Sequence, residues 1–466
     1  MLNSSPDAHK PSLWFAHALL EQGWARDVRM EISGAGEISA LHTGVAAEAQ
    51  DRRGGIAVPG LGNVHSHAFQ RGMAGLAERR GHEGDSFWTW REAMYRFVDQ
   101  VQPEEMEAIA ALAYAEMLES GFTRVGEFHY LHHDLRGHEY ENSALMAQHL
   151  ALAASNTGIG MTLLPVFYAQ GGFGGVPPTQ AQRRFLCNLK QFAELFRKCR
   201  EMLRETLPDA VLGVAPHSLR AVMPEQLEDL CAMVGRGPIH IHVAEQRREV
   251  EDCIEWSGTR PVQWLLDNAE VDERWCLVHA THVDDEELAA MVARRAVVGL
   301  CPVTEANLGD GLFPAARFMA LGGRFGVGSD SNVHIDAMEE LRILEYGQRL
   351  THQARNVLAL NAGDSTGAAL FHAARTGGAQ ALGVADRGLA VGAVADIVGF
   401  DDLDVAFAGR YPEAYLDAVV FAAQKPVREV WRRGELVVVA GRHVRREAIE
   451  SGYRRAVSRV LGGGAG

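Results

Sequence analysis

The sequence has 466 residues, of which 47% are hydrophobic and 23% are charged, and its formal net charge at pH 7 is −15. This balance is typical of a globular protein with a sizeable core, and an acidic chain without a basic run disfavours nucleic acids and anionic membranes as partners. The opening MLNSSPDAHK lacks a basic and a long apolar stretch, and no segment approaches the roughly 20 apolar residues of a membrane span, so we expect a cytoplasmic protein. Six cysteines without a C-x-x-C pair disfavour a disulfide scaffold and a zinc ribbon.

The first predicted elements, in residues 12–58, are short strands separated by glycine-containing turns. From residue 56 to 333, short β-branched or apolar runs alternate with long amphipathic stretches. The apolar runs predict eight strands, namely IAVPGLGNVH, FTRVGEFHY, GMTLLPVFY, AVLGVAPHS, PIHIHVAE, WCLVHATH, AVVGLCPV and RFGVGSD. The stretches between them, such as PEEMEAIAALAYAEMLESG and DDEELAAMVARR, repeat apolar residues every three or four positions and predict helices.

Strands that alternate with helices pair in parallel through crossover connections, and about eight such units predict an α/β fold, a closed (β/α)8 TIM barrel. An open, doubly wound sheet is the alternative. Residues 386–445 return to short strands and turns, as at the start of the chain. We therefore expect a small β-sandwich domain, built from residues 1–58 and 386–466 of both chain termini, beside a barrel of residues 59–385.

Polar residues stand at the carboxyl ends of the predicted barrel strands. They are His65, His67, Glu127, His129, His217, His242, Glu245, His279 and Asp330. Because these ends meet on one face of a barrel, this placement favours the barrel over the open sheet and predicts the active site on that face.

His65 and His67 are two residues apart on a predicted strand, so their side chains point to the same side and can bind one metal ion. An isolated H-x-H pair is more often a pair of polar core residues. His242, His279 and Asp330 at other strand ends favour the metal site, because three imidazoles and a carboxylate suit Zn²⁺ or Fe²⁺ and leave room for a water molecule.

Glu245 follows His242 by three residues in HVAE, which places its carboxyl group beside the predicted metal site. A carboxyl group in this position can carry a proton to a leaving nitrogen atom. The alternative is an ion pair with Arg247 or Arg248. His240 lies on the same side of the strand as His242 but deeper in the barrel, and we expect it to be packed or hydrogen-bonded there.

The segments around these residues resemble the amidohydrolase superfamily, in its aminohydrolase branch with one zinc ion. They are PGLGNVHSHAFQRGMAGLAE, HVAEQ, LVHATHVDDEEL, CPVTEANLGDG and GSDSN, and GAVADIVGFD resembles part of the flanking sandwich. The fourth predicted strand carries His217 where a lysine would be needed for a carbamate-bridged metal pair, so the resemblance implies one metal per chain. The ligands that it implies for this Zn²⁺, or alternatively Fe²⁺, are His65, His67, His242 and Asp330.

The resemblance also implies catalytic roles for three residues. Asp330 would accept a proton from the attacking water, and His279 would orient this water and stabilise the charge that develops on its oxygen atom. Glu245 would pass the proton to the leaving nitrogen atom.

Further stretches resemble a narrower family, the formimidoylglutamate deiminases. They are HSHAFQRGMAGLAE, SFWTWREAMYRFV, GEFHYLHHD, LLPVFYAQGGFGG and APHSLRAV. The resemblance implies the conversion of N-formimino-L-glutamate to N-formyl-L-glutamate and ammonia in histidine degradation, and it suggests a homodimer. The metal ligands alone would not separate this family from guanine- or adenosine-type deaminases.

The substrate implied by this resemblance is a small molecule with two carboxylates and an amidine, so an acidic protein must supply local cations. Arg91 and Arg220 are predicted to bind the carboxylates, because a guanidinium group can grip a carboxylate through two hydrogen bonds. Gln70, Tyr130 and His217 are predicted as further substrate contacts. The alternatives are a surface ion pair for Arg91 and a contact with a helix carboxyl end for Arg220.

Two other functions are considered. One is another aminohydrolase with a single zinc ion, such as a guanine- or adenosine-type deaminase, against which the two arginines and the family-like loops argue. The other is a metal-free barrel that acts as a binding or assembly protein, against which the ligand types at the strand ends argue.

Overall fold

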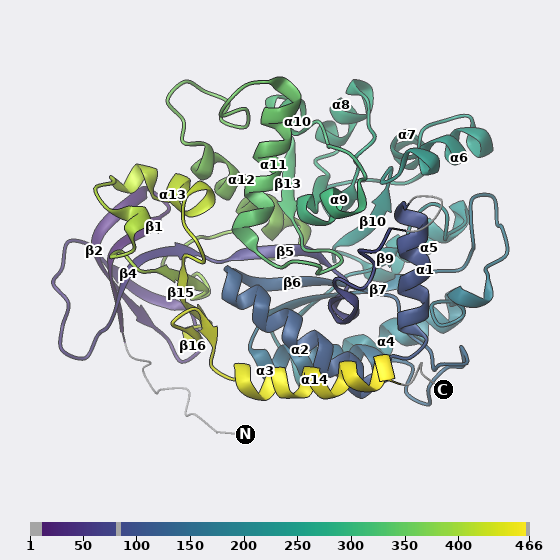
Figure 1. Ribbon diagram of the computed structural model, residues 1–466, viewed down its shortest axis with the longest axis horizontal. Coiled ribbons are helices and arrows are strands. Elements are labelled where there is room, and N and C mark those ends of the chain that lie inside the picture. Colours follow the sequence, from purple (N-terminus) through teal and green to yellow (C-terminus); the bar gives the residue numbers. More distant parts are fainter. Residues whose placement is uncertain (1–11, 81–84, 463–466) are drawn as a thin grey trace.

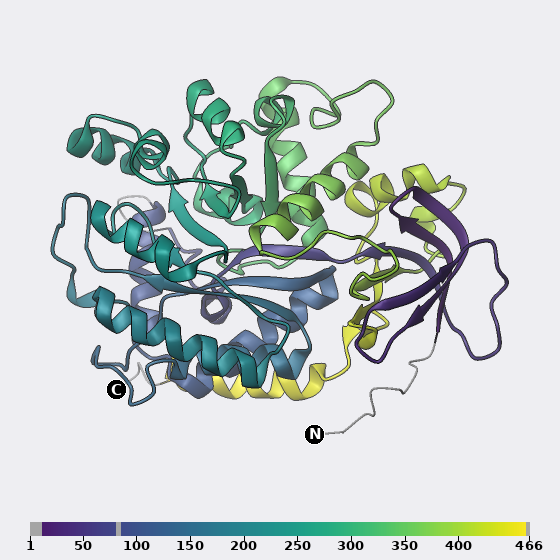
Figure 2. The same cartoon turned by 180° about the vertical axis from the view of Figure 1, so that it is seen from behind.

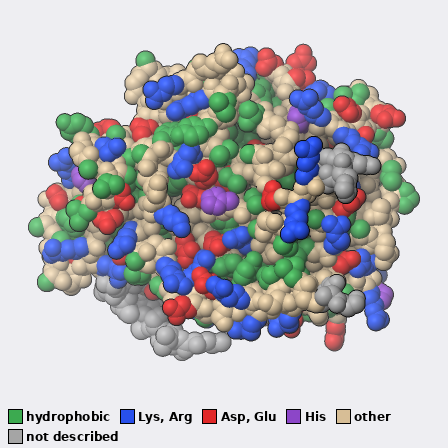
Figure 3. All heavy atoms as spheres, viewed as in Figure 1, with side chains coloured by type: hydrophobic (Ala, Val, Ile, Leu, Met, Phe, Trp, Pro, Cys, Tyr) green, Lys and Arg blue, Asp and Glu red, His purple; other side chains and the backbone are tan. Residues whose placement is uncertain are grey.

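The computed structural model describes residues 12–80 and 85–462. Figures 1 and 2 show a barrel with helices on its outside and a β-sheet at one end of the molecule, where the first and the last strands of the chain lie together. On the face shown in Figure 3, basic and acidic side chains are interspersed. None of the described helices is long and apolar enough to cross a membrane. The opening MLNSSPDAHK lies outside the described residues, so the prediction made from it stays a prediction.

The barrel strands form one parallel sheet that closes into a ring. Their bounds are β5 Leu61–Ser66, β6 Phe122–His129, β7 Gly160–Phe167, β8 Val211–Leu212, β9 Ala215–Pro216, β10 Ile239–Val243, β11 Trp275–His279, β12 Val297–Leu300 and β13 Arg324–Val327. The strand order is β10-β11-β12-β13-β5-β6-β7-β8, with β9 also paired to β7. Bridges from Val214 to Ile239 and from Ser218 to His242 close the ring. The predicted barrel is therefore confirmed over the open sheet.

Two of the predicted strands are each divided at a glycine. The first consists of β4 (Arg52–Pro59), which belongs to the terminal sheet, and β5, which belongs to the barrel. A Cβ atom at Gly60 would lie 2.2 Å from the Thr123 side chain, so glycine is what allows the chain to pass between the two sheets at this point. The fourth predicted strand is divided into β8 and β9 at Gly213, where a Cβ atom would lie 2.6 Å from the Leu164 side chain.

Helices surround the barrel strands (Figure 1), and the two stretches quoted in the sequence analysis, residues 103–121 and 284–295, form helices as their apolar periodicity predicts. The connection from β5 to β6 holds a 3₁₀ helix, Ala68–Met73, and the helices α1 Phe87–Val98 and α2 Pro103–Ser120. The remaining barrel helices are α3 Leu145–Thr157, α4 Leu189–Thr206, α5 Pro224–Val234, α6 Arg247–Ser257, α7 Pro261–Asn268, α8 Asp285–Ala293, α9 Pro302–Leu308, α10 Ala315–Ala320, α11 Ala337–His352 and α12 Thr366–Ala381.

The two ends of the chain pair in one eight-stranded sheet. Its other strands are β1 Leu13–Leu20, β2 Gly23–Ile32, β3 Ile38–His42, β14 Ile397–Phe400, β15 Val427–Arg432, β16 Glu435–Val439 and β17 Arg442–His443. The order is β17-β16-β15-β14-β4-β1-β2-β3, and β4 joins the halves because it pairs with both β1 and β14. Phe15 and Trp431 meet edge to face in its apolar core, with ring centroids 5.4 Å apart. The association of both termini that was predicted for the β-sandwich is confirmed, and the structure forms it as one eight-stranded sheet.

The C-terminal segment, predicted as the end of the sandwich and a tail, contains a further helix, α14 (Arg446–Gly462). Both views show it along α2 of the barrel (Figures 1 and 2). The apolar part of this contact includes Leu112, Ala115 and Ile449. Arg446 adds ion pairs to Glu116 at 3.2 Å and to Glu119 at 2.8 Å, so the chain end is fastened to the barrel.

Helix α12 packs against β13 at backbone contact. A Cβ atom on Gly377 of α12 would lie 1.9 Å from the carbonyl oxygen of Phe325 in β13. A larger residue must push the helix away from the barrel wall, because the atom in the way belongs to the backbone and cannot rotate aside.

We expect Gly377→Ala to lower the free energy of unfolding by about 3 kcal/mol, because the added methyl group displaces α12 from β13. Gly452→Ala in α14 is the matched control, since a Cβ atom there meets its nearest neighbour at 4.0 Å. That exchange should raise stability by roughly 0.5–1 kcal/mol through helix propensity. Urea denaturation followed by circular dichroism measures both variants, and equal stabilities would contradict the close contact.

Candidate active site and metal centre

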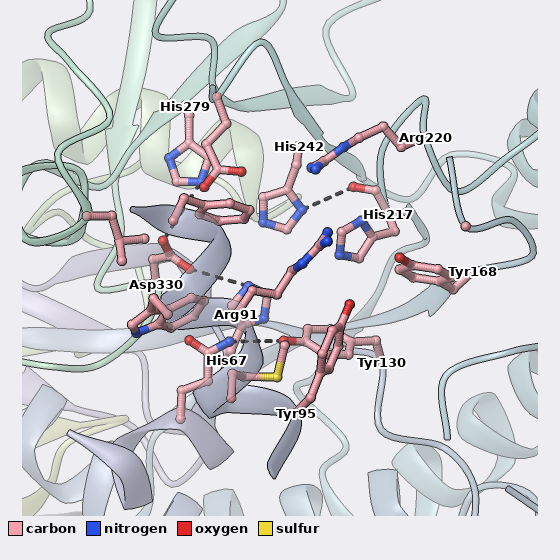
Figure 4. A pocket seen from close by; sticks show the side chains of 17 residues that line it. His67, Arg91, Tyr95, Tyr130, Tyr168, His217, Arg220, His242, His279 and Asp330 are labelled. Atoms are coloured by element: carbon pink, nitrogen blue, oxygen red, sulfur yellow. Dashed lines mark hydrogen bonds and ion pairs between the residues drawn. The ribbon is translucent and has the colours of Figure 1, made fainter. Parts of the chain in front are cut away.

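A pocket lies at the carboxyl ends of the barrel strands (Figure 4). Its lining residues are His67, Gln70, Phe87, Trp90, Arg91, Met94, Tyr95, Tyr130, Tyr168, Gly171, His217, Arg220, His242, Glu245, His279, Leu308 and Asp330. Every residue predicted for substrate binding or catalysis lines the pocket. Of the four predicted metal ligands, His67, His242 and Asp330 line it and His65 does not. Glu127 and His129, at another strand end, are buried but do not line the pocket.

The four predicted metal ligands converge at the floor of the pocket. The Nε2 atom of His65 lies 3.2 Å from Nε2 of His67 and 3.0 Å from Nε2 of His242. Oδ1 of Asp330 lies 3.5 Å from His65 Nε2 and 3.4 Å from His67 Nε2. All four side chains are buried, and their ligand atoms lie within 4.8 Å of one another.

The protonation of these histidines fits a bound cation. Nδ1 of His67 lies 3.0 Å from the Phe128 carbonyl oxygen, and Nδ1 of His242 lies 3.1 Å from the His217 carbonyl oxygen, so each Nδ1 carries the proton that it donates. Their Nε2 atoms are left with lone pairs that point at one another, an arrangement that a cation between them stabilises. Burial lowers the pKa of His65 to about 3 and lowers that of His67 and His242, so all three imidazoles are neutral.

Asp330 completes this donor set with a negative charge. Burial opposes that charge, but the bond to His65 and the nearby His279 together lower the pKa of Asp330. Three neutral imidazoles and one carboxylate are a donor set for a divalent transition metal, so the chain's own residues fit such an ion.

Several residues at these strand ends have strained backbone conformations. The φ angle is 67° at His279, 44° at Asp330 and 55° at Asn332, a region that non-glycine residues rarely adopt. The side-chain amide of Asn332 donates to the carbonyl oxygens of His67 at 3.0 Å and Asp330 at 3.1 Å and so holds the two ligand strands together. The motif GSDSN contained this asparagine, but the sequence alone did not indicate its role.

His279 is held by a buried carboxylate that the sequence analysis missed. Its Nδ1 atom lies 3.2 Å from Oε1 of Glu305, which also accepts a hydrogen bond from the backbone N–H of Cys301 at 2.8 Å. On the other side of the ring, Nε2 lies 3.8 Å from Oδ2 of Asp330. Burial opposes a charge on His279, but Glu305, Glu245 and Asp330 outweigh it and raise its pKa to about 10.

Glu245 is buried at the edge of the metal-binding group and faces the pocket. Among the described residues it forms no ion pair with Arg247 or Arg248, which was the alternative prediction. Its backbone N–H donates to Glu249 at 3.1 Å, and this bond fixes the turn after β10. Burial raises the pKa of Glu245 to about 7, so its carboxyl group can gain and lose a proton near neutral pH.

The two predicted arginines both reach the pocket, Arg91 from α1 and Arg220 from the loop after β9 (Figure 4). Within residues 12–80 and 85–462, neither guanidinium group forms an ion pair with a carboxylate, and Nε of Arg220 is buried without a hydrogen bond. Burial opposes the charge of Arg220, but the nearby Glu249 and Glu245 raise its pKa. The surface ion pair and the helix-end contact considered for them are therefore absent from this part of the chain. Two unpaired cations in one pocket suit a ligand with two anionic groups.

Polar groups of the remaining wall are aimed into the same space. The side-chain amide of Gln70 donates to the Tyr130 hydroxyl at 2.9 Å, while its Oε1 atom is buried and unpaired. Two tyrosines that the sequence analysis missed complete the wall: Tyr95 of α1, and Tyr168, whose ring centroid lies 4.7 Å from that of His217. Tyr168 lies in the family-like loop LLPVFYAQGGFGG, which was the available signal.

Two conspicuous residues of the motifs have structural surroundings. Nε2 of His240 lies 2.7 Å from the Ala381 carbonyl oxygen, deep in the barrel, as expected of a hydrogen-bonded core histidine. Arg71, which follows Gln70, pairs with Glu116 of α2 through Nε at 2.6 Å.

Comparison with known families agrees with this architecture. A family profile described as Amidohydrolase family matches residues 56–437. A second profile, described as Formimidoylglutamate deiminase HutF, N-terminal domain, matches residues 14–55. Since the Amidohydrolase family profile matches most of this chain, the chain belongs to the amidohydrolase family.

Individual relatives narrow this assignment. A formimidoylglutamate deiminase from Pseudomonas aeruginosa PAO1 is 49% identical over 454 residues, which are 97% of this chain and 99% of that protein. The crystal structure of an amidohydrolase from Brucella melitensis is 52% identical, with a TM-score of 0.94 over 97% of this chain and 100% of that one. A zinc-bound adenosine deaminase from Xanthomonas campestris, at 21% identity and a TM-score of 0.79 over 98% of this chain and 100% of that one, shares the fold. The chain is a member of the formimidoylglutamate deiminase family, which confirms the resemblance found in the sequence.

We expect His242→Asn to lose the bound metal, because one of the converging imidazoles is removed. His240→Asn is the matched control on the same strand, two residues away. It should keep about one metal ion per chain and lose about 1 kcal/mol of stability with its buried hydrogen bond. Elemental analysis of the dialysed proteins measures the metal content, and metal loss in His240→Asn alone would contradict the ligand assignment.

Proposed function

We propose that this protein is a formimidoylglutamate deiminase, which hydrolyses N-formimino-L-glutamate to N-formyl-L-glutamate and ammonia in histidine degradation. The observation that carries the proposal is the pair of guanidinium groups, Arg91 and Arg220, that face the pocket without carboxylate partners among the described residues. A substrate with two carboxylates supplies both partners and leaves its amidine for the metal centre. The near full-length relationship to the Pseudomonas deiminase supports the same reaction.

The metal that we propose is one Zn²⁺ per chain, with Fe²⁺ as the alternative, because both accept three imidazoles and a carboxylate. When bound, it lowers the pKa of a water molecule and so supplies a nucleophile at neutral pH. The residues that would hold it are His65, His67, His242 and Asp330.

The protein's own groups then move the protons of the reaction. Asp330 accepts the first proton of the attacking water at a carboxylate oxygen that its low pKa keeps ionised. His279, oriented by Glu305, presents Nε2 toward Asp330 and stabilises the negative charge that develops on the attacking oxygen. Glu245 delivers a proton to the imino nitrogen, which becomes an amino group of the tetrahedral intermediate. The proton held by Asp330 then passes to this amino group, and the remaining hydroxyl proton returns to Glu245 as the formyl carbonyl forms. The bond between that nitrogen and the formimino carbon then breaks, and ammonia leaves.

The substrate is oriented by five side chains. Arg91 and Arg220 bind one carboxylate each, and Tyr130 and His217 contribute further hydrogen bonds from the pocket wall. The unpaired Oε1 atom of Gln70 accepts a hydrogen bond from an amidine N–H, which is a donor that a carboxylate ligand would lack. A homodimeric state and a cytoplasmic location stay predictions that belong to this proposal.

The proposed reaction predicts turnover of one substrate. Zinc-loaded protein should release ammonia from N-formimino-L-glutamate with N-formyl-L-glutamate as the second product, and it should leave guanine and adenosine unchanged. Glu245→Gln is the control for contaminating activity, since it should keep its zinc and lose turnover by about 10²–10⁴-fold. Release from guanine or adenosine instead would assign the site to a different aminohydrolase.

The proposed contacts of Arg91 and Arg220 with the substrate carboxylates can be tested separately. Arg91→Met and Arg220→Met should each raise KM by roughly 10–100-fold with a smaller change in kcat, because each loses a charge-assisted contact to a part of the substrate that does not react. Arg454→Met, an exposed arginine of α14 that pairs with Glu450 at 3.6 Å, is the control and should behave as wild type. Steady-state kinetics decide, and an unchanged KM in either pocket variant removes that arginine from the substrate site.

A further inference from the structure

Among the described residues, Arg91 is held by aromatic rings and by no acid. It belongs to α1, which is capped by Ser86, whose hydroxyl accepts a hydrogen bond from the backbone N–H of Trp88 at 3.3 Å. Trp88 and Arg91 are three residues apart on this helix, so their side chains are neighbours. The Cζ atom of Arg91 lies 4.5 Å from the Trp88 ring centroid and 5.7 Å from that of Tyr95.

A second guanidinium group reaches the same tryptophan from another part of the barrel. The Cζ atom of Arg248 lies 5.1 Å from the Trp88 ring centroid. Arg248 is the second residue of α6, which follows directly on the turn that carries Glu245. Trp88 therefore connects α1, which carries Arg91, to α6, which begins two residues after Glu245.

The chemistry of such a contact suits an arginine that must bind a ligand. An aromatic face attracts a guanidinium cation through its quadrupole and occupies none of the N–H donors, which lie in the guanidinium plane. A carboxylate partner would fix the group equally well, but it would occupy those donors and compete with the substrate. The ring thus fixes the position of Arg91 and leaves its hydrogen-bonding edge free.

We infer that Trp88 is a positioning residue for the substrate: its ring, itself held by Arg248, fixes Arg91 in the orientation that binds one substrate carboxylate. This inference rests on the proposed function. Trp88 is not among the residues that line the pocket, so it acts through Arg91 and not by touching the substrate.

The experiment compares steady-state kinetics with N-formimino-L-glutamate for zinc-loaded variants. Trp88→Leu should raise KM about tenfold and change kcat less than about threefold, because the lost contact serves binding rather than chemistry. Trp88→Phe keeps an aromatic face and should stay within about threefold of the wild-type KM. Arg248→Met should raise KM about threefold. Arg200→Met, which loses a similar stack on Phe196 at 5.0 Å in α4, is the control and should not change KM.

The double variant Arg91→Met/Trp88→Leu decides whether Trp88 acts through Arg91. Its KM should equal that of Arg91→Met alone within about twofold, because the tryptophan has no guanidinium left to position. The inference is overturned if Trp88→Leu raises KM by the same factor in the wild-type and Arg91→Met backgrounds, or if Trp88→Leu alone leaves KM unchanged.

If Trp88→Leu does not fold, the effect of Arg248→Met on KM is compared in the wild-type and Arg91→Met backgrounds, and equal effects in both overturn the inference. Wild-type protein without turnover refutes the proposed function, whereas wild-type turnover with an unaffected Trp88→Leu variant refutes this inference alone.

Discussion

The arrangement of the predicted metal ligands depends on one short contact just beyond the ends of β5 and β13. The backbone N–H of His67 donates to the Asp330 carbonyl oxygen at 2.9 Å, and the backbone N–H of Asp330 donates to the His65 carbonyl oxygen at 2.9 Å. These bonds set the register between the first and the last barrel strands. A slip of one residue would turn His65 and His67 away from Asp330, because side chains alternate along a strand. The contact between the first and the last barrel strands thus also brings together three of the four predicted metal ligands, His65, His67 and Asp330.

The candidate site holds acidic and basic side chains in separate positions, although acids outnumber bases in the protein as a whole. Two of its carboxylates flank one imidazole: Glu305 lies 3.2 Å from Nδ1 of His279, and Asp330 lies 3.8 Å from Nε2 of the same ring. Among the described residues its two guanidinium groups form no ion pair with an acid, and Arg91 rests on aromatic rings. The separation preserves cations for an anionic substrate in a chain where acids outnumber bases.

Much of this architecture could be predicted because its signals are local in the sequence. The barrel strands are apolar runs, and each predicted metal ligand stands at the end of one, so the pattern of a single segment indicates both the strand and its candidate ligand. Glu305 was missed because its contact with His279 depends on how α9 folds back over the strand ends. Tyr95 was missed because a tyrosine on an amphipathic helix has the same pattern whether it faces a core or a pocket. Helix α14 was predicted as a tail because its many charged residues find their partners on α2, which lies far away in the sequence.

The terminal sheet has a consequence for biosynthesis. Strand β4 pairs with β1 on one side and with β14 on the other, and β14 leaves the ribosome after all the barrel strands. During translation the N-terminal half of this sheet therefore presents an unpaired edge, a surface that other chains can pair with. Arg52 and Arg53 stand at the start of β4, beside residues 56–59 that β14 later pairs with, and charge next to an open edge hinders the pairing of one nascent chain with another.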